Sequence, residues 1–363
     1  MNIKKELVNF SSRLPNWINE LLVVLNANPN LIYGKKYATY KEFLKGNKDY
    51  YNNSKDLVSI FNYAVENVPF YHKYDKINSV NEFEEHCGFI DKNIVSENFE
   101  MLQSKKIQYS KYDLVTTGGT TGKPLRMYIS KDRYVIEKAT IHFLWSQVGF
   151  KHDKRAVIRN HRIRGEKPFR INPLTKEFQF DGYKMTDDYF EEVFKTIKKY
   201  KIPFVHAYPS SAYLFAKHLE RKKNDLSFFK GFICSSENLF DYQKNFIKNE
   251  LRKTIYSFYG HSEKLVIGGF CKDSDYYHME PTYGYFELID DNGMPIREAG
   301  KTGEIVGTTL NNFGMPLIRY KTDDFAEYVG DYCPKCGRKL PVIKNLTGRR
   351  SGRRIYSKDG SVT

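Results

Sequence analysis

The sequence predicts an α/β fold with a small, mostly antiparallel β-subdomain towards its end. Between residues 126 and 258, short apolar runs typical of buried strands alternate with stretches whose apolar residues recur at helical spacing. Between residues 283 and 310, the alternating pattern around a turn indicates paired antiparallel strands. A chain of 363 residues that is 40% hydrophobic can form a sizeable core, so we do not expect global disorder.

The first hundred residues are expected to be mainly helical, with helices covering residues 1 to about 70. An amphipathic run ends at turn formers in residues 26–30. A second helix is predicted over residues 55–67, because apolar side chains recur there with a helical period, and the Val68–Tyr71 turn ends it. Residues 80–105 predict two short helices joined by a loop.

The central part of the chain alternates predicted strands with predicted helices. The strands are Arg126–Ile129, Ala156–Ile158, Phe204–Tyr208, Phe232–Cys234 and Ile255–Phe258. The helices are Asp132–Val148, Tyr189–Tyr200 and one capped by Pro209, Ser210 and Ser211. A basic stretch with Arg159, His161, Arg162 and Arg164 follows one strand, and it is either a surface loop or a segment that lines an acyl site or approaches phosphate.

Charge and cysteine content bound the setting of the protein. The net charge is +15 and the pI is near 9.3, but the lysines are scattered, for example over the polar helix face with Lys195, Lys198, Lys199 and Lys201. We therefore expect a basic surface that suits anionic substrates such as ATP and no nucleic-acid partner, while the 28 Tyr and 26 Phe leave a membrane-surface contact open. The five cysteines are unevenly placed, which argues against a disulfide framework, so we expect the protein in a reducing cytoplasm. We expect neither a signal peptide nor a transmembrane segment.

A glycine- and threonine-rich loop, LVTTGGTTGKPL, follows residue 113. Glycine allows close approach of backbone N–H groups to an anion, and threonine hydroxyls and a lysine add further donors. The candidate phosphate-binding residues are Thr116, Thr117, Gly118, Gly119, Thr120, Thr121, Gly122 and Lys123. Pro124 stands where a P-loop NTPase needs Ser or Thr, and a plain turn between two strands is the alternative.

Further polar clusters follow later strands. Ser235, Ser236 and Glu237 follow one strand and, by themselves, indicate a helix cap. The next strand is followed by a second such cluster, which is either a ligand-binding segment or a turn with a helix cap. It consists of Tyr259, Gly260, His261, Ser262 and Glu263. The stretch MPLIRYKTDD ends at Asp324, and Gly348 and Arg349 follow near the end.

Four of these motifs, in this order, resemble those of adenylate-forming (AMP-binding) enzymes. The loop is similar to TSGTTGKP, with Gly118 in place of serine. The segment YGHSE is similar to the family motif YGxTE, and MPLIRYKTDD is similar to PLIRYRTGD, with Asp323 in place of glycine. The pair Gly348–Arg349 is similar to the start of the family's hinge motif. The resemblance implies the large amino-terminal domain of such an enzyme, with two mixed sheets flanked by helices.

The resemblance also implies ligands and roles. ATP or AMP would bind with Mg²⁺, for which a carboxylate such as Glu263 is a suitable hard ligand. Lys123, Thr120 and Glu263 would be catalytic, Asp324 and Arg349 would hold the ribose, and the remaining residues of the loop, the Ser235–Glu237 segment and the Tyr259–Ser262 segment would bind adenine and phosphate. The reaction would form an acyl-adenylate, and coenzyme A or an amine would then accept the acyl group.

The Val68–Tyr71 turn and the segment HAYPSSAYLFAKHL are similar to phenylacetate–CoA ligase-like proteins, the latter to their capsular-polysaccharide-biosynthesis branch. Substrate-binding residues are therefore expected at His161, His206, Tyr208 and Pro209, although His206 alone is slightly more typical of a buried core histidine than of a catalytic residue. An amino sugar is a conceivable acceptor.

The predicted domain boundaries follow the motifs. They are a helical part at residues 1–110, an α/β core at 111–265, a β-subdomain at 266–347 and a hinge at 348–363. The resemblance implies a further carboxy-terminal domain of about a hundred residues, which carries the family's catalytic lysine. We expect this domain to be absent, because the chain ends at the hinge.

A second site is predicted from a CxxC motif. Cys333 and Cys336 can direct two thiolates at one ion, and Cys271 and His278 upstream complete a Cys₃His set that suits structural Zn²⁺. A redox CxxC lacks a thioredoxin-like context. Cys87 and Cys234 are expected to be free core thiols.

The sequence thus predicts a ligase that activates a carboxylate. The alternative is a non-catalytic scaffold of the same fold that binds nucleotide in polysaccharide assembly, favoured slightly by Gly118, Asp323 and the altered hinge. The acyl substrate, the acceptor and the oligomeric state stay open.

Overall fold

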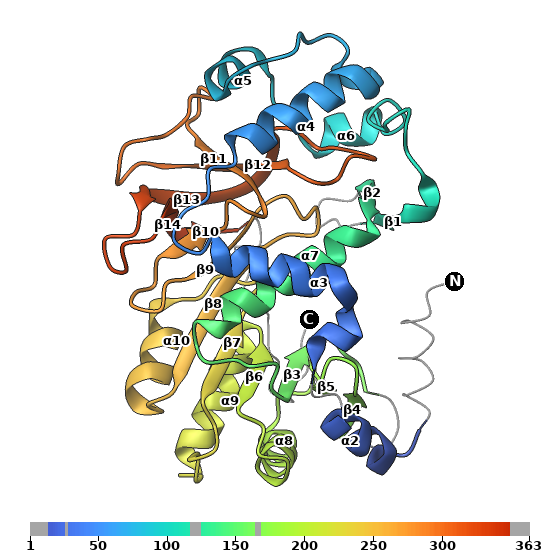
Figure 1. The fold of residues 1–363 in the computed structure, drawn as a ribbon. Coiled ribbons are helices and arrows are strands. Elements are labelled where there is room, and N and C mark those ends of the chain that lie inside the picture. Colours follow the sequence, from blue (N-terminus) through green and yellow to red (C-terminus); the bar gives the residue numbers. More distant parts are fainter. Residues whose placement is uncertain (1–13, 26–27, 117–124, 164–167, 349–363) are drawn as a thin grey trace. The chain divides into compact units, whose positions relative to one another are not determined.

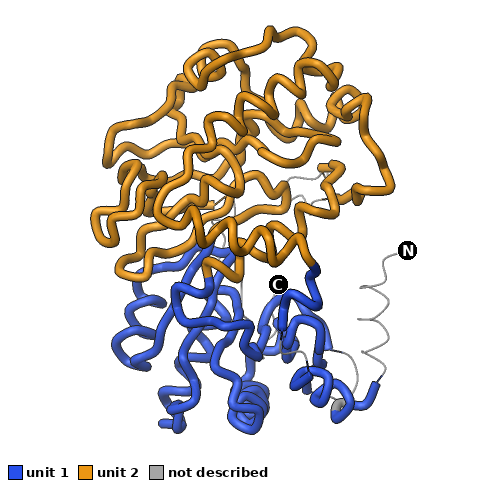
Figure 2. The backbone as a smooth tube through the Cα atoms, viewed as in Figure 1, with its two compact units in different colours: residues 1–34, 145–258, 350–363 blue, residues 35–144, 259–349 orange. Residues whose placement is uncertain are grey.

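The computed structural model of the protein describes residues 14–25, 28–116, 125–163 and 168–348. The described chain divides into two compact units, each assembled from separate segments (Figure 2). Of the described residues, unit 1 comprises 14–25, 28–34, 145–163 and 168–258, and unit 2 comprises 35–116, 125–144 and 259–348. The predicted domain boundaries stay predictions.

Unit 1 contains an open sheet with the strand order β8-β7-β6-β3-β5-β4 (Figure 1). Neighbouring strands from β8 to β5 are parallel, and the edge strand β4 is antiparallel to β5. The strands are β3 (Arg155–Arg159), β4 (Phe169–Asn172), β5 (Glu177–Asp181), β6 (Phe204–Ala207), β7 (Gly231–Cys234) and β8 (Thr254–Gly260), the last of which leaves unit 1 after Phe258.

The helices of unit 1 cover this sheet through one apolar core. They are α2 (Asn16–Leu25), α8 (Asp187–Lys199), α9 (Pro209–Arg221) and α10 (Asp241–Asn245), which continues as a π-helical turn at Phe246–Glu250. The core joins Val193 and Ile197 of α8 and Phe215 and Leu219 of α9 to fully buried residues of the strands. These apolar residues recur every three to four positions, as the sequence pattern predicts.

Unit 2 contains an antiparallel sheet with the strand order β11-β12-β13-β14-β10-β9 and a separate hairpin, β1-β2 (Figure 1). The strands are β1 (Tyr112–Thr116), β2 (Arg126–Ser130), β9 (Ile267–Phe270), β10 (Tyr277–Met279), β11 (Gly284–Ile289), β12 (Thr302–Thr309), β13 (Tyr320–Tyr332) and β14 (Lys339–Thr347). The helices are α4 (Ser54–Asn67), α5 (Val80–His86) and α6 (Lys92–Glu97), with short 3₁₀ turns at Pro69–Tyr71 and Tyr109–Lys111.

Two further helices begin in one unit and end in the other. Helix α3 (Pro29–Gly46) is interrupted at Gly34, whose φ of 81° is non-helical, and α7 spans Lys131–Ser146. Within the residues that the structure describes, no helix combines the length and the apolar character needed to cross a bilayer.

The predicted α/β class is confirmed, and most predicted elements are found within a few residues of their expected ends. One local prediction is wrong. The side chains of Ser210 and Ser211 do not cap α9, because Pro209 is its first residue and Tyr208 occupies the N-cap position without a side-chain hydrogen bond.

Candidate functional site

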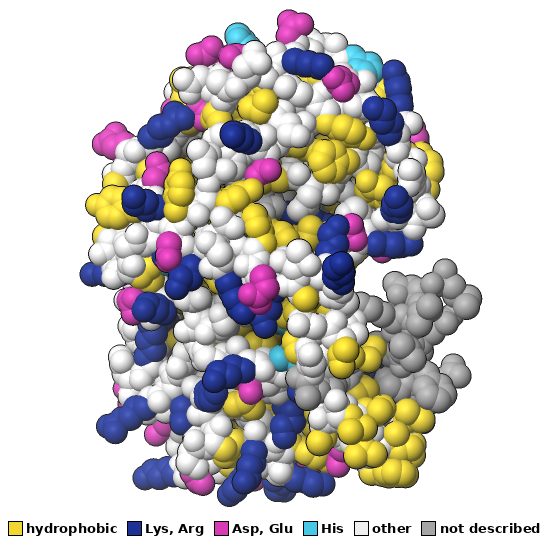
Figure 3. All heavy atoms as spheres, viewed as in Figure 1, with side chains coloured by type: hydrophobic (Ala, Val, Ile, Leu, Met, Phe, Trp, Pro, Cys, Tyr) yellow, Lys and Arg dark blue, Asp and Glu magenta, His cyan; other side chains and the backbone are white. Residues whose placement is uncertain are grey.

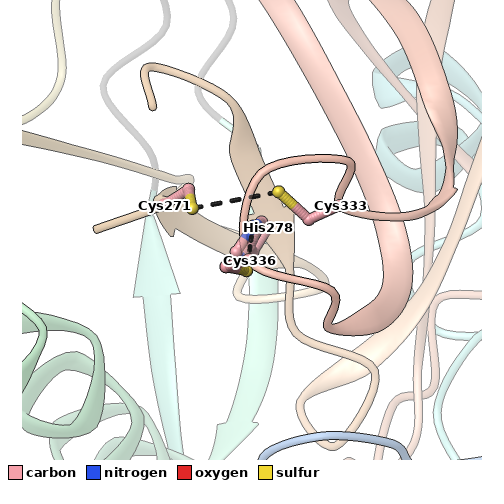
Figure 4. Close-up of side chains that lie close together, drawn as sticks. All are labelled: Cys271, His278, Cys333 and Cys336. Carbon is pink, nitrogen blue, oxygen red and sulfur yellow. Dashed lines mark hydrogen bonds between the residues drawn. The ribbon is translucent and has the colours of Figure 1, made fainter. Parts of the chain in front are cut away.

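Two strand connections of unit 2 bring the four predicted metal ligands together. Cys271 directly follows β9 and His278 lies on β10, while Cys333 and Cys336 lie in the tight connection between β13 and β14. Strand β10 pairs with both β9 and β14, so these two connections meet at the same end of the sheet. Figure 4 shows the four side chains converging on one point.

The distances between these side chains suit a tetrahedral ion. All four ligand atoms lie within 4.8 Å of one another, and the three cysteines are free thiols. The Cys271 and Cys333 Sγ atoms are 3.8 Å apart, and Cys336 Sγ lies 3.7 Å from His278 Nε2. Zinc bonds of ordinary length to sulfur and nitrogen at tetrahedral angles require separations of roughly 3.8 Å and 3.6 Å. These two separations match the values expected for zinc, so the set suits Zn²⁺.

Surrounding groups hold the ligands in place. The Gly337 N–H donates to the Cys333 carbonyl over 2.8 Å, and the φ of 77° at Gly337 explains why glycine closes this turn. The Arg338 guanidinium bonds to the Glu280 carboxylate over 3.1 Å and lies 3.4 Å from His278 Nδ1. Burial, and secondarily the Arg338 charge, lower the pKa of His278 to about 4, so the imidazole is in the neutral form that a metal ligand needs.

A second group of predicted residues lies elsewhere in unit 2. Tyr259, near the end of β8, is buried, and its hydroxyl donates to Asp324 Oδ2 on β13 over 2.8 Å. Burial and the Asp324 charge raise the pKa of Tyr259 well above its ordinary value, so the hydroxyl keeps its proton and remains a donor. Asp324 is fixed further by its own N–H, which donates to Thr322 Oγ1 over 3.2 Å.

The segment after Tyr259 is a tight turn, and no helix follows it in the described chain. The Val266 N–H donates to His261 Nε2 over 3.4 Å, so the ring proton lies on Nδ1, which is 3.1 Å from Glu263 Oε2. Lys264 has a φ of 57°, and its side chain pairs with Glu137 over 2.5 Å. His261 thereby orients the Glu263 carboxylate.

Arg133 of α7 anchors the same turn. Its guanidinium is fully buried and donates to the Lys264 carbonyl from Nε over 3.0 Å. It also donates to the Tyr283 carbonyl and to Asn311 Oδ1, each over 2.8 Å. Burying a guanidinium is costly unless its donors are satisfied, so Arg133 is a strong positional constraint on the turn.

Asp323 replaces the glycine of the resembling motif, and its backbone explains why the exchange is tolerated. Its φ is 56°, in the left-handed region that glycine favours and that aspartate adopts more readily than most residues. The pairing of β12 with β13 is irregular at this point, as a bulge requires. The Asp323 side chain is exposed, so its added charge is well solvated.

In unit 1, a polar cluster lies at the carboxyl ends of three parallel strands. Arg159 ends β3, His206 lies on β6, and Ser236 follows β7 with a φ of 67°. The Arg159 guanidinium bonds to His206 Nε2 and to Ser236 Oγ, each over 2.9 Å, and lies 5.0 Å from the centre of the Tyr208 ring. The chain turns in opposite directions after β3 and β6, which is where open sheets place ligands.

The other predicted residues of unit 1 have structural contacts. The Glu237 carboxylate accepts from the Ser210 N–H and hydroxyl over 3.2 Å and 2.6 Å, so it caps α9. The His161 N–H donates to the Arg159 carbonyl over 2.7 Å, and burial lowers the pKa of its imidazole. His206 is buried with its ring 5.1 Å from that of Trp145, and Pro209 begins α9.

Several predicted residues lie outside the described part of the chain. They are Thr117, Gly118, Gly119, Thr120, Thr121, Gly122 and Lys123 of the phosphate loop, and Arg349 of the hinge. Thr116 is described, as the last residue of β1. Sequence reasoning missed the positioning roles of Arg133, Glu280 and Arg338, because a single arginine or glutamate carries no motif and its role depends on long-range contacts.

The fold is shared with solved structures of one enzyme. An open conformation of 2-hydroxyisobutyryl-CoA ligase in complex with 2-HIB-AMP and CoA matches with a TM-score of 0.63 at 17% identity, covering 84% of this chain and 75% of that chain. The same ligase in its thioesterification state, with the same ligands, matches with a TM-score of 0.63 at 19% identity over 81% and 67%. The ligase in its postadenylation state, in complex with R3-HIB-AMP, matches with a TM-score of 0.63 at 17% identity, covering 81% of this chain and 66% of that chain.

At this level of identity, the likeness to the ligase shows a common fold. No protein-family model and no curated protein matches the sequence. The chain therefore shares its fold with this CoA ligase over the aligned region.

Proposed function

We propose that this protein activates a carboxylate with ATP and Mg²⁺, forming an acyl-adenylate and pyrophosphate. The observation that carries the proposal is the pairing of Tyr259 with Asp324, which holds a carboxylate ready at the end of the motif that resembles PLIRYRTGD. Support also comes from the fold, since the similar ligase structures contain an acyl-AMP.

The proposed roles follow the chemistry of each group. Asp324 would accept hydrogen bonds from the ribose hydroxyls, and Tyr259 would pack against adenine as well as fix Asp324. Glu263 would hold Mg²⁺, for which its oxygen donors are suitable, and the bound ion would neutralise phosphate charge. Ser235, Ser236 and Glu237 are proposed adenine contacts, although Glu237 also caps α9.

In the first half-reaction, a carboxylate oxygen of the substrate forms a bond to the α-phosphorus of ATP, and the bond to pyrophosphate breaks. The protein's task is to align these groups and to stabilise the negative charge that develops. Lys123 and the hydroxyl of Thr120 would donate to the phosphate oxygens. A thiol of coenzyme A or an amine would then take the acyl group and release AMP.

The acyl substrate would bind near the polar cluster formed by Arg159, His206 and Ser236. The proposed contacts are His161, His206, Tyr208 and Pro209. The cluster supports this assignment because it lies at the carboxyl ends of parallel strands. An amine acceptor such as an amino sugar, a role in surface polysaccharide synthesis and a cytoplasmic location extend the same proposal.

We also propose that Cys271, His278, Cys333 and Cys336 bind a structural Zn²⁺. Four protein ligands leave no position for substrate, so the ion would stabilise the fold and take no part in the reaction. It would link the β9–β10 connection to the β13–β14 connection.

A non-catalytic nucleotide-binding scaffold is the second candidate. It is favoured because two carboxylates proposed to bind ligands already have partners in the protein. Glu237 bonds to Ser210, and Glu263 bonds to His261. A scaffold would bind nucleotide but would not exchange pyrophosphate into ATP.

Calorimetric titration with ATP and Mg²⁺ tests the proposal on the native chain, Asp324→Ala and Asp323→Gly. Losing two hydrogen bonds to a charged acceptor should weaken binding of Asp324→Ala at least tenfold. Asp323→Gly is the matched control, because its exposed carboxylate has no proposed ligand, and it should bind like the native chain. A native chain without affinity for ATP would contradict both candidates, and carboxylate-dependent ATP–pyrophosphate exchange separates the enzyme from the scaffold.

A further inference from the structure

Helix α2 carries a second apolar face, which points away from the core of unit 1. Trp17, Leu21, Val24 and Leu25 recur at helical spacing along one side of the helix, and they are 67%, 53%, 72% and 68% exposed. We call these four residues the outer face of α2. A surface helix normally exposes polar residues on this side, and clustered exposed apolar side chains mark an interaction site.

The opposite side of α2 is firmly attached to unit 1. Val23 is buried in the main apolar core, and α2 packs against the edge strand β4. Glu20, the one acidic residue of the helix, accepts a hydrogen bond from the Tyr200 hydroxyl at the end of α8. The outer face is therefore presented by a docked helix.

Basic residues flank Tyr200, the residue whose hydroxyl bonds to Glu20 of α2. Lys198, Lys199 and Lys201 surround Tyr200, and all three are exposed. Lys195, one turn earlier, pairs with Glu192, whereas these three lysines form no ion pair with a carboxylate in the described part of the chain. We call Lys198, Lys199 and Lys201 the basic flank. Figure 3 shows hydrophobic side chains gathered at the position of α2, with Lys and Arg side chains along the same end of unit 1.

We propose that the outer face of α2 and the basic flank dock unit 1 onto an anionic phospholipid surface. A helix that lies in the membrane interface buries apolar side chains among the acyl chains and presents Lys and Arg to anionic headgroups. The ten residues of α2 are too few to span a bilayer, so the helix lies in the plane of the interface. The positive charge of the basic flank favours an anionic partner over a neutral apolar one, and the net charge of +15 favours it further.

The tryptophan content makes the contact directly measurable. The chain has two tryptophans, and Trp145 is buried while Trp17 lies in the outer face. Titration with phosphatidylglycerol vesicles should shift the fluorescence of Trp17 to shorter wavelength, and Trp17→Phe should abolish the shift. Phosphatidylcholine vesicles should give little response, and high salt should weaken binding to phosphatidylglycerol.

Co-sedimentation with the same vesicles separates the two parts of the surface. Leu21→Ser with Leu25→Ser should weaken binding roughly a hundredfold, because two large apolar side chains are lost. Gln in place of all three flank lysines should weaken it by about fivefold per lysine. Met294→Ser in unit 2 removes an equally exposed apolar side chain and should leave binding unchanged.

Three results would overturn the proposal. The first is a native chain that does not sediment with phosphatidylglycerol vesicles. The second is vesicle binding that survives the paired leucine substitutions. The third is a Trp17 shift that depends on protein concentration without vesicles, together with dimers in analytical ultracentrifugation, which would assign the outer face to a second copy of the chain. None of these measurements involves nucleotide, so they are independent of the proposed ligase activity.

Discussion

The zinc proposal predicts that Cys336→Ser removes both metal and stability. Cys336 supplies one of four ligands, and its sulfur lies 3.7 Å from His278 Nε2, so the variant leaves three ligands around the ion. Metal that binds only the folded chain stabilises it by RT ln(1 + [metal]/Kd), about 4 kcal/mol when free zinc exceeds the Kd a thousandfold. For a unit of about 200 residues, this corresponds to a melting temperature roughly 10 °C higher.

The assay combines elemental analysis with thermal unfolding, for the native chain and for Cys336→Ser, each with and without a chelator. The native chain should contain one zinc per molecule, and chelation should lower its melting temperature to near that of the variant. Cys87→Ala is the matched control, because it removes a buried thiol of the same unit that is no ligand, and it should keep its zinc. The reasoning is refuted if Cys336→Ser retains a full equivalent of zinc, or if chelation leaves the native melting temperature unchanged.

Three further substitutions test the fold around the sites. Arg319→Met leaves the buried Glu287 without its guanidinium, which should cost about 3–5 kcal/mol of unfolding free energy at pH 8. Burial raises the pKa of Glu287 from 4.5 to about 7, so the stability that protonated Glu287 contributes is fully present below pH 4.5 and is lost as the pH rises through 7. In urea unfolding, Arg319→Met should therefore cost less free energy at pH 5 than at pH 8. An equal cost at both pH values would contradict this account. Gly182→Ala places a Cβ 1.5 Å from the Arg159 carbonyl oxygen, so urea unfolding should show a loss of about 2–3 kcal/mol, and a neutral effect would show that the end of β3 yields easily. Thr186→Ala removes the N-cap of α8, where the threonine hydroxyl accepts from the Tyr189 N–H over 3.3 Å, and should cost about 1 kcal/mol, against a Thr186→Ser control near zero.

The sequence alone determined the local elements and the chemistry of the motifs. The periodicity of residues 55–67 predicts α4, and the apolar runs at 204–208 and 232–234 predict β6 and β7, because burial of one face imposes a fixed spacing on apolar residues. The CxxC spacing predicts a metal-binding turn for a similar reason, since two thiolates and a glycine define its geometry locally. These inferences use neighbours in the chain, which a pattern can record.

The contacts between distant segments were decided by the tertiary structure. Cys271 and Cys333 are 62 residues apart, and their proximity follows from the pairing of β10 with both β9 and β14. Strand pairing is set by which edges remain available once the cores form, and no local pattern specifies that choice.

The same reason explains the polar residues that sequence reasoning missed. Arg133 reaches the turn at Lys264 across 131 positions, and Arg338 reaches Glu280 across 58. A single arginine looks the same in the local sequence whether its side chain is solvated or hydrogen-bonds to a distant turn. Its role therefore depends on the tertiary packing that brings its partners close.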